Sequence, residues 1–249
     1  AAIRSQLITT SPVEKALLFD YPTRYELLDK IATLYGYESL LKPQLLPAPG
    51  KFLYSTAEKN GVWQGIYPYF ISSINNHVPH PEPAALFEKI SEGQIWRFVT
   101  PIFLHGDLLH LFFNMVWLLV IGTQMEMRLS TSRYLFFIII SAIISNTAQY
   151  LVSGCAFIGF SGVICAIAFF IRQRQLRTPW EGYQLSRPTF QFILFFIGIL
   201  TVLSFISFVL EATTLRVFPI AIANTAHLTG AIVGSLLGRL HFFAWQENS

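Results

Sequence analysis

Two polar residues in otherwise apolar stretches have the chemistry for nucleophilic attack. Ser161 lies in the segment GFSG (159–162), and His227 lies further along in AHLTG (226–230). Polar and ionisable groups at membrane depth are costly and usually mark a functional site. A serine hydroxyl beside an imidazole base is the minimum equipment for covalent attack by a hydroxyl. The pair therefore predicts a nucleophilic site, provided that the surrounding elements bring the two side chains together.

The composition indicates a protein of the lipid bilayer. Hydrophobic residues make up 53% of the 249 positions, which include 23 Phe, and only 12% are charged. This is too apolar for an ordinary soluble domain. The two cysteines give neither a disulfide framework nor zinc spacing, and the net charge of +3 gives no reason to expect a nucleic-acid partner. Residues 1–10 have no long apolar core, so we expect no cleaved signal peptide there.

Five segments are apolar enough to cross a bilayer, which takes about 20 residues of helix. The four longer ones are Phe98–Met127, Tyr134–Val152, Thr189–Leu210 and Phe218–Phe243. The fifth, Phe157–Ile171, covers about 22 Å of a hydrocarbon core of about 30 Å. Neighbouring helices must therefore surround it, and Ser161 near its start should lie below the membrane surface. The sequence predicts an all-α, multi-pass membrane bundle.

The arginines predict how this bundle is oriented. Short connections rich in Arg stay on the cytoplasmic side of a membrane. The connections at one face carry Arg128, Arg133, Arg172, Arg174, Arg177, Arg187 and Arg239. We therefore expect a cytoplasmic C-terminus, with residues 244–249 as a tail, and a site that opens to the non-cytoplasmic side.

Residues 1–97 are expected to form an N-terminal helix and an interfacial loop ahead of a membrane core at 98–243. The segment Pro12–Leu41 has helical character but contains many charges and Pro22. Central charges oppose spanning, so it is either a first span supported by neighbours or an amphipathic surface helix. The segment Pro43–Pro83 is rich in Pro, Gly and aromatic residues, which predicts a structured loop in the membrane interface.

Span direction and helical period place the polar residues together. The spans that hold His110 and Asn114, Ser161, and His227 all run inward from the non-cytoplasmic face, so these residues share the outer half of the membrane. Gly230, Gly234 and Gly238 form one stripe below His227, and such stripes let two helices approach closely in lipid. The small-residue face of Ser161, Cys165 and Ala168 is the expected partner. His110 and Asn114, one turn apart, are expected donors to a developing oxyanion, together with the Ser161 backbone N–H.

Each feature also has a plain structural explanation. A single membrane serine is usually a packing or back-bonding residue, a single histidine is often structural or a proton relay, and a glycine stripe alone indicates helix packing. The polar residues agree in membrane depth and in the helix face that they occupy, and this agreement favours a functional site. His105 and Asp107, at the mouth of the first span, are explained equally well by solvation or capping. There is no His-Glu-x-x-His pattern, so we expect no metal and no cofactor.

The motifs, taken in order, resemble the rhomboid family of intramembrane serine proteases. They are Trp96-Arg97, HGDLLHLFFN (105–114), Gly122-x-x-x-Glu126-x-Arg128, GFSG with Gly159 and Gly162, and His227-x-x-Gly230-x-x-x-Gly234. The resemblance covers about Trp96 to Phe243. It implies a six-helix core in which Trp96, Arg97, Glu126, Arg128, Gly230 and Gly234 are structural, and Gly159, Gly162, Cys165 and His105 adjoin the site.

The resemblance also implies a mechanism and a substrate. Ser161 and His227 would form a dyad without a third, acidic member, and His110, Asn114 and the Ser161 N–H would form the oxyanion hole. The substrate would be a transmembrane protein cut near the outer end of its helix, in what we expect to be a bacterial plasma membrane. A loop near Leu210–Phe218 would cap the opening.

Two positions depart from the family pattern. Members usually carry a Tyr one turn after the nucleophile, stacked on the catalytic histidine, where this chain has Cys165. The charged segment Pro12–Leu41 stands where the family has an apolar first helix. The predicted function is intramembrane serine proteolysis. The alternative that Cys165 favours is a catalytically weak relative that binds and escorts membrane clients. A transporter or channel would need paired charges or broken helices at the midplane, and the five spans show neither.

Overall fold

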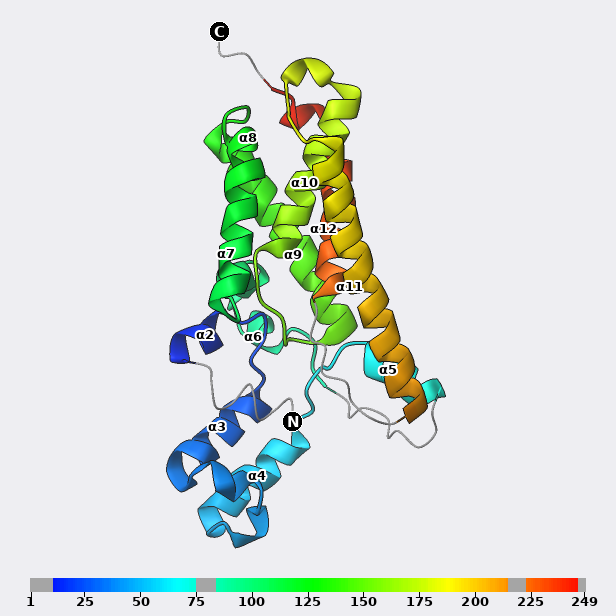
Figure 1. Cartoon of the computed structure of the whole chain (residues 1–249). Coiled ribbons are helices and arrows are strands. Elements are labelled where there is room, and N and C mark those ends of the chain that lie inside the picture. The colour runs from blue at the N-terminus through cyan, green and yellow to red at the C-terminus, as the bar shows by residue number, and fades with distance from the viewer. Residues whose placement is uncertain (1–10, 75–83, 215–222, 246–249) are drawn as a thin grey trace.

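The structure, a computed structural model, describes residues 11–74, 84–214 and 223–245. All regular structure in these residues is helical, which confirms the predicted all-α class. Three helices are long and apolar enough to cross a membrane: Leu108–Glu126, Thr131–Ser153 and Arg187–Leu210. They run lengthwise along the bundle, with the C-terminal end of the chain at one end and the N-terminal region at the other (Figure 1).

The first span begins about ten residues later than Phe98, where it was predicted to start. It consists of α7 (Leu108–Trp117), a π-helical turn η5 (Leu118–Gly122) and α8 (Thr123–Glu126). The preceding residues form two short turns, η3 (Ile95–Phe98) and η4 (Thr100–Phe103). Asp107 ends the irregular stretch, because its carboxylate accepts a hydrogen bond from the backbone N–H of His110 at 2.8 Å and caps α7.

The next span, α9 (Thr131–Ser153), agrees with the predicted Tyr134–Val152. The helix α11 (Arg187–Thr214) contains the predicted Thr189–Leu210 and continues beyond it. The loop expected to cap the opening, near Leu210–Phe218, therefore lies partly in α11 and partly in residues 215–222, outside the described residues.

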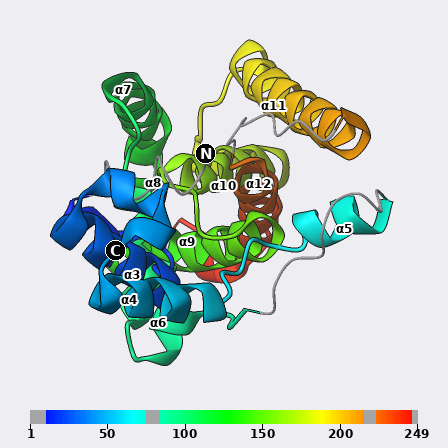
Figure 2. The same ribbon diagram turned by 90° about the horizontal axis from the view of Figure 1, so that it is seen from below.

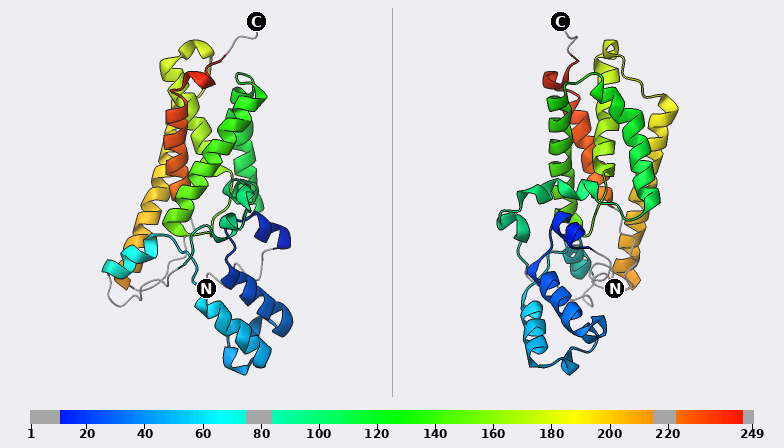
Figure 3. Two further views of the ribbon diagram at one scale, coloured as in Figure 1. Left: turned by 180° about the vertical axis from the view of Figure 1, so that it is seen from behind. Right: turned by 90° about the vertical axis from the view of Figure 1, so that its left-hand side faces the viewer.

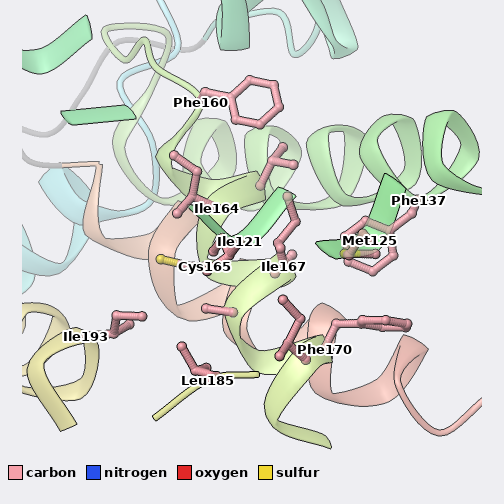
Figure 4. Close-up of a cluster of buried hydrophobic side chains, with 14 of the residues drawn as sticks. Ile121, Met125, Phe137, Phe160, Ile164, Cys165, Ile167, Phe170, Leu185 and Ile193 are labelled. Atoms are coloured by element: carbon pink, nitrogen blue, oxygen red, sulfur yellow. The ribbon is translucent and has the colours of Figure 1, made fainter. Parts of the chain in front are cut away.

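The shortest predicted span forms the centre of the bundle. The helix α10 (Ser161–Arg177) begins four residues after Phe157 and extends past Ile171, so that Ser161 is its first residue. At about 25 Å it is shorter than the hydrocarbon core, and its neighbours enclose it. Its fully buried side chains are Val163, Ala166, Ile167, Ala168, Phe170 and Ile171. Figure 4 shows several of them packed with Ile121, Met125 and Phe137 from the first two spans.

The last core helix, α12 (Asn224–Leu237), lies against α10. It is shorter than the predicted Phe218–Phe243, since residues 218–222 are not described and a turn, η7 (His241–Phe243), follows it. Seen along the bundle, α10 and α12 lie side by side with α9 next to them, while α7 and α11 stand further out (Figure 2).

The segment Pro12–Leu41 is not a single spanning helix. It is divided into α2 (Pro12–Leu17), α3 (Thr23–Tyr35) and the turn η1 (Tyr37–Leu40). Pro22 separates the first two, and Gly36, with φ +81°, ends α3. The longest piece has 13 residues, or about 20 Å, too short to cross a bilayer. Within the described residues this segment therefore supplies no sixth core helix.

The predicted interfacial loop Pro43–Pro83 is also more ordered than expected. It contains the turn η2 (Pro43–Leu45) and the helices α4 (Ala48–Lys59) and α5 (Tyr67–Ile74), while residues 75–83 lie outside the described part. The helices α3 and α4 pack as a hairpin around a small core of Leu28, Ile31, Leu46 and Ala57. This hairpin projects from the end of the bundle opposite the C-terminus (Figure 3).

The N-terminal region is fastened to the bundle through Asp20. Its buried carboxylate accepts hydrogen bonds from the Tyr150 hydroxyl of α9 at 3.0 Å and from the backbone N–H groups of Glu88 and Lys89 at 3.1 Å. The last two residues begin a short helix, α6 (Glu88–Ser91). Burial raises the pKa of Asp20, and these donors partly oppose the shift.

Candidate active site

Ser161 stands where an irregular segment turns into α10. The preceding Gly159 has φ +120°, a conformation that side chains rarely adopt, and its N–H donates to the carbonyl oxygen of Pro101 at 3.0 Å. The backbone N–H groups in the first turn of a helix have no intrahelical acceptor. The segment GFSG thus places both the hydroxyl and the backbone N–H of Ser161 at the half-buried start of a buried helix.

The Ser161 hydroxyl and the His227 imidazole are in hydrogen-bond contact. Oγ of Ser161 lies 2.7 Å from Nε2 of His227, in the first turn of α12. His227 is 7% exposed, and its Nδ1 has no hydrogen-bond partner among the described residues. With the proton on Nδ1, Nε2 is free to accept from the serine hydroxyl. Among the described residues, no carboxylate completes a triad with this pair.

Close approach of α10 and α12 brings the two residues together. A Cβ added to Gly230 would stand 2.1 Å from the carbonyl oxygen of Gly162, and one added to Gly234 would stand 1.9 Å from that of Ala166. Backbone meets backbone at both levels, so no side chain fits. The predicted stripe of small residues therefore faces the Ser161 helix, as expected of helices packed in lipid.

His110 lies against the same glycine that precedes the serine. A Cβ on Gly159 would be 2.8 Å from Cε1 and Nε2 of His110 and 3.9 Å from Oγ of Ser161. The His110 imidazole and the serine hydroxyl therefore flank one small space. The ring of His105 stands edge-on to that of His110, with centroids 5.1 Å apart. Burial, and next the nearby His110, lower the pKa of His105.

Asn114 is buried one turn further along α7, but its amide is turned toward its own helix. Its Nδ2 donates to the carbonyl oxygen of His110 at 2.9 Å. One of its two N–H bonds is thus already used. Of the two donors expected from α7, the structure brings His110 close to Ser161 and leaves the Asn114 amide bonded to the His110 carbonyl oxygen.

Cys165 lies one turn beyond Ser161 and is buried in the core cluster (Figure 4). Within the described residues no aromatic ring stacks on His227. The imidazole is therefore held by the Ser161 hydroxyl and by the packing of α12.

The remaining predicted residues lie away from the reacting atoms. The Arg97 guanidinium donates to the carbonyl oxygens of Lys15 and Leu18 at 2.9 and 2.6 Å, and the Trp96 indole donates to that of Ala16 at 3.2 Å, so this pair holds α2. At the opposite end, Arg128 donates to the carbonyl oxygens of Glu181 and Gly182 at 2.7 and 2.6 Å. Glu126 is exposed there.

Sequence reasoning missed a buried polar row on α9. Ser141, Ser145 and Gln149 recur every four residues and are all 3% exposed or less. The Gln149 carboxamide accepts a hydrogen bond from the backbone N–H of Ala226 at 3.0 Å and so satisfies a donor in the first turn of the helix that carries His227. The four-residue repeat of polar residues in an apolar span was the signal for this row.

Comparison with known proteins places this geometry in a family. Residues 92–243, more than half of the chain, match the sequence profile of the rhomboid domain. The chain belongs to the rhomboid family. It is similar to rhomboid protease GlpG of Yersinia pestis (strain Pestoides F), 38% identical over 144 residues, and to rhomboid protease GlpG of Yersinia enterocolitica (serotype O:8 / biotype 1B), 36% identical over 144 residues. Each match covers 58% of this rhomboid chain and 47% of the relative, so the chain spans about half the length of these relatives.

The apolar helices and the family together make this rhomboid an integral membrane protein. The match begins just before Trp96 and ends at Phe243, so it includes all five core helices. It leaves out α2 to α6, the part of the chain that carries the hairpin and Asp20.

Proposed function

We propose that this chain is an intramembrane serine protease in which Ser161 is the nucleophile and His227 its general base. The observation that carries the proposal is the 2.7 Å contact between Oγ of Ser161 and Nε2 of the buried His227, in a bundle of apolar helices. Nucleophile and base within hydrogen-bond reach are the signature of covalent catalysis by a serine. The relatives named as rhomboid proteases support the same assignment.

The chemistry follows from the two atoms in contact. As Oγ of Ser161 attacks the scissile carbonyl, its proton passes to Nε2 of His227, and a tetrahedral intermediate forms. The imidazolium then returns the proton to the leaving amine, which leaves an acyl-enzyme on Ser161. Water, activated by the same imidazole, releases the acyl group and restores the serine. Without an acidic third member, packing must hold the ring.

The oxyanion would be stabilised from two sides. The proposed donors are the Ser161 N–H, in the first turn of α10, and the His110 side chain, which lies against Gly159. Asn114 joins them if substrate binding draws its amide away from the His110 carbonyl oxygen. Catalytic hydrogen bonds are often long or poorly aligned in the free enzyme and tighten only in the substrate or transition-state complex.

The substrates we propose are transmembrane proteins cut near the outer ends of their helices. The site lies at the non-cytoplasmic end of α10 if the arginine-rich end of the bundle faces the cytoplasm, which is the orientation that we propose. The relatives from Yersinia support a bacterial plasma membrane as its location. A six-helix core, of which α7 with its continuation, α9, α10, α11 and α12 are five members, is likewise our proposal for the whole protein.

A second candidate function is client binding with little catalysis. It is favoured by Cys165, by the absence of a ring on His227 and by the unpartnered Nδ1 of that residue within the described part of the chain. A panel of transmembrane peptides in proteoliposomes separates the two. The protease proposal expects cleavage products that disappear with Ser161→Ala. Capture of uncleaved peptides, equal in the parent and in Ser161→Ala, would favour the escort function.

A further inference from the structure

A basic pocket lies at the end of the bundle opposite Ser161. It has a volume of about 560 Å³ and is bounded by the end of α10, by the turn η6 (Pro179–Glu181) and by the residues that follow α12. These segments meet at the arginine-rich end (Figure 3). We define the basic pocket by its lining residues, Arg174, Arg177, Thr178, Trp180, Arg239, His241, Ala244 and Trp245.

The charge of the basic pocket is not balanced from within. Arg174, in its wall, is already committed, because its guanidinium pairs with the buried Glu181 and donates to the carbonyl oxygen of Gly238. Arg177 and Arg239 are exposed and form no ion pair with any described residue. None of the lining residues is acidic. Two unpaired guanidinium groups around one pocket favour a phosphate or carboxylate group.

An apolar groove continues from the basic pocket along the bundle. It has a volume of about 430 Å³ and lies between α11 and α12, where Figure 2 shows the two helices standing apart. Arg239 lines both the groove and the basic pocket. The other residues that line the groove are Phe169, Leu194, Ile197, Leu228, Ala231, Ile232, Ser235 and Leu236.

The length of the groove matches a lipid chain. From Arg239 to Leu228 the α12 face rises eleven residues, or about 16 Å. One leaflet occupies about half of a hydrocarbon core of about 30 Å. A charged recess that opens into an apolar groove of this length is complementary to an amphiphile, whereas a soluble anion would use only the recess. Trp180 and Trp245, with ring centroids 6.3 Å apart, mark the headgroup level, where aromatic side chains are favoured.

We propose that this site binds one anionic phospholipid from the leaflet at this end of the bundle. The phosphate lies in the basic pocket on Arg177 and Arg239, and one acyl chain lies in the groove between α11 and α12. Basic recesses between membrane helices are known to hold anionic headgroups. The acyl chain would cover apolar groove side chains that the protein leaves exposed, namely Leu194, Ile232 and Leu236 at 44, 61 and 53%.

Native mass spectrometry of the purified chain in detergent tests the site. Phosphatidylglycerol and phosphatidylcholine with identical acyl chains are titrated against the parent, the double variant Arg177→Gln/Arg239→Gln, and the control Arg187→Gln. Arg187 is exposed at the same end but lines neither the basic pocket nor the groove. We expect the parent to retain phosphatidylglycerol about tenfold more tightly than phosphatidylcholine. The double variant should lose this preference, and Arg187→Gln should keep it.

Two further arms separate a lipid from a free anion. Ser235→Phe fills the groove and should weaken phosphatidylglycerol binding several-fold without changing the weak binding of inorganic phosphate. Equal retention of the two lipids, or equal losses in Arg187→Gln and the double variant, would overturn the site. Displacement of the lipid by inorganic phosphate at equal concentration would contradict the lipid proposal and show that the site binds a free anion. Thermal unfolding of each variant checks that it is folded.

Discussion

Gly234 of α12 lies so close to α10 that a Cβ on it would stand 1.9 Å from the carbonyl oxygen of Ala166. The same contact repeats one turn closer to the site, between Gly230 and Gly162. These contacts set the distance between the two helices that carry Ser161 and His227. The hydrogen bond between those side chains therefore depends on residues that never touch a substrate.

Gly234→Ala should accordingly destabilise the bundle and separate the dyad. The added methyl group meets backbone, so α12 must move, at a cost of about 1–3 kcal/mol or more. Thermal unfolding in detergent measures the loss of stability, and reactivity of Ser161 measures the loss of alignment. Gly198→Ala is the matched control, since a Cβ there has no atom within 4 Å. In mid-helix it should be neutral or stabilising by about 0.5–1 kcal/mol. Equal effects of the two substitutions would show that the close contact is unimportant.

The sequence predicted this packing because the glycine stripe and its small-residue partner have a clear helical period. It predicted helix ends less well. The true start of the first span depends on the Asp107 cap, and hydropathy cannot detect a cap inside an apolar run. For the segment Pro12–Leu41 the sequence predicted either a first span or an amphipathic surface helix. Pro22 and Gly36 instead divide it into shorter pieces that match neither alternative.

Breaking the buried pair of Arg174 and Glu181 should be strongly destabilising. Both side chains are 4% exposed or less, and Glu181 also accepts from the backbone N–H of Trp245 at 3.1 Å. Arg174→Met or Glu181→Leu alone leaves a buried charge without its partner, at a cost of about 3–5 kcal/mol. The double variant should lose less stability than the sum of the losses of the two single variants. Chemical unfolding of all four proteins gives the coupling, and additive losses would argue against a direct interaction.

This pair also shows where sequence reasoning ended. Arg174 was read as one of seven arginines that orient the protein, because charge counts carry no information about which arginine is buried. In the structure it is a structural residue seven positions before its partner. Asn114 was expected in the site from span direction, helical spacing and the family resemblance. None of these can say that its amide turns back to the His110 carbonyl oxygen.

Cys165→Tyr should increase the reactivity of Ser161. A ring one turn beyond the serine would be placed to stack on His227, and such contacts are worth about 0.5–1.5 kcal/mol, or about two- to tenfold in rate. The rate of modification of Ser161 by an organophosphorus probe measures the effect. Cys165→Leu is the control for bulk without a ring. No difference between the Tyr and Leu variants would remove the stacking explanation.

Acid should destabilise the region around His105. Its pKa is lowered from an ordinary value of 6.5 in the folded protein, so the unfolded chain binds the proton more tightly. The contribution to stability is fully present above pH 6.5 and is lost as the pH falls below it toward the folded value. As the pH falls from about 7.5 to about 5, the unfolding temperature of the parent should decrease, and that of His105→Asn should decrease less. The same pH dependence in both would assign the effect to other groups.

The central claim is that Ser161 is a nucleophile activated by His227, and labelling with a fluorophosphonate tests it most directly. The purified protein in detergent is treated with the probe, and the modified residue is identified by peptide mass spectrometry. We expect the adduct on Oγ of Ser161 and none in Ser161→Ala. The rate should be at least about 100-fold lower in His227→Ala and unchanged in Ser132→Ala, an exposed serine in the first turn of α9. An unlabelled parent protein, or equal labelling of Ser161→Ala, would contradict the account.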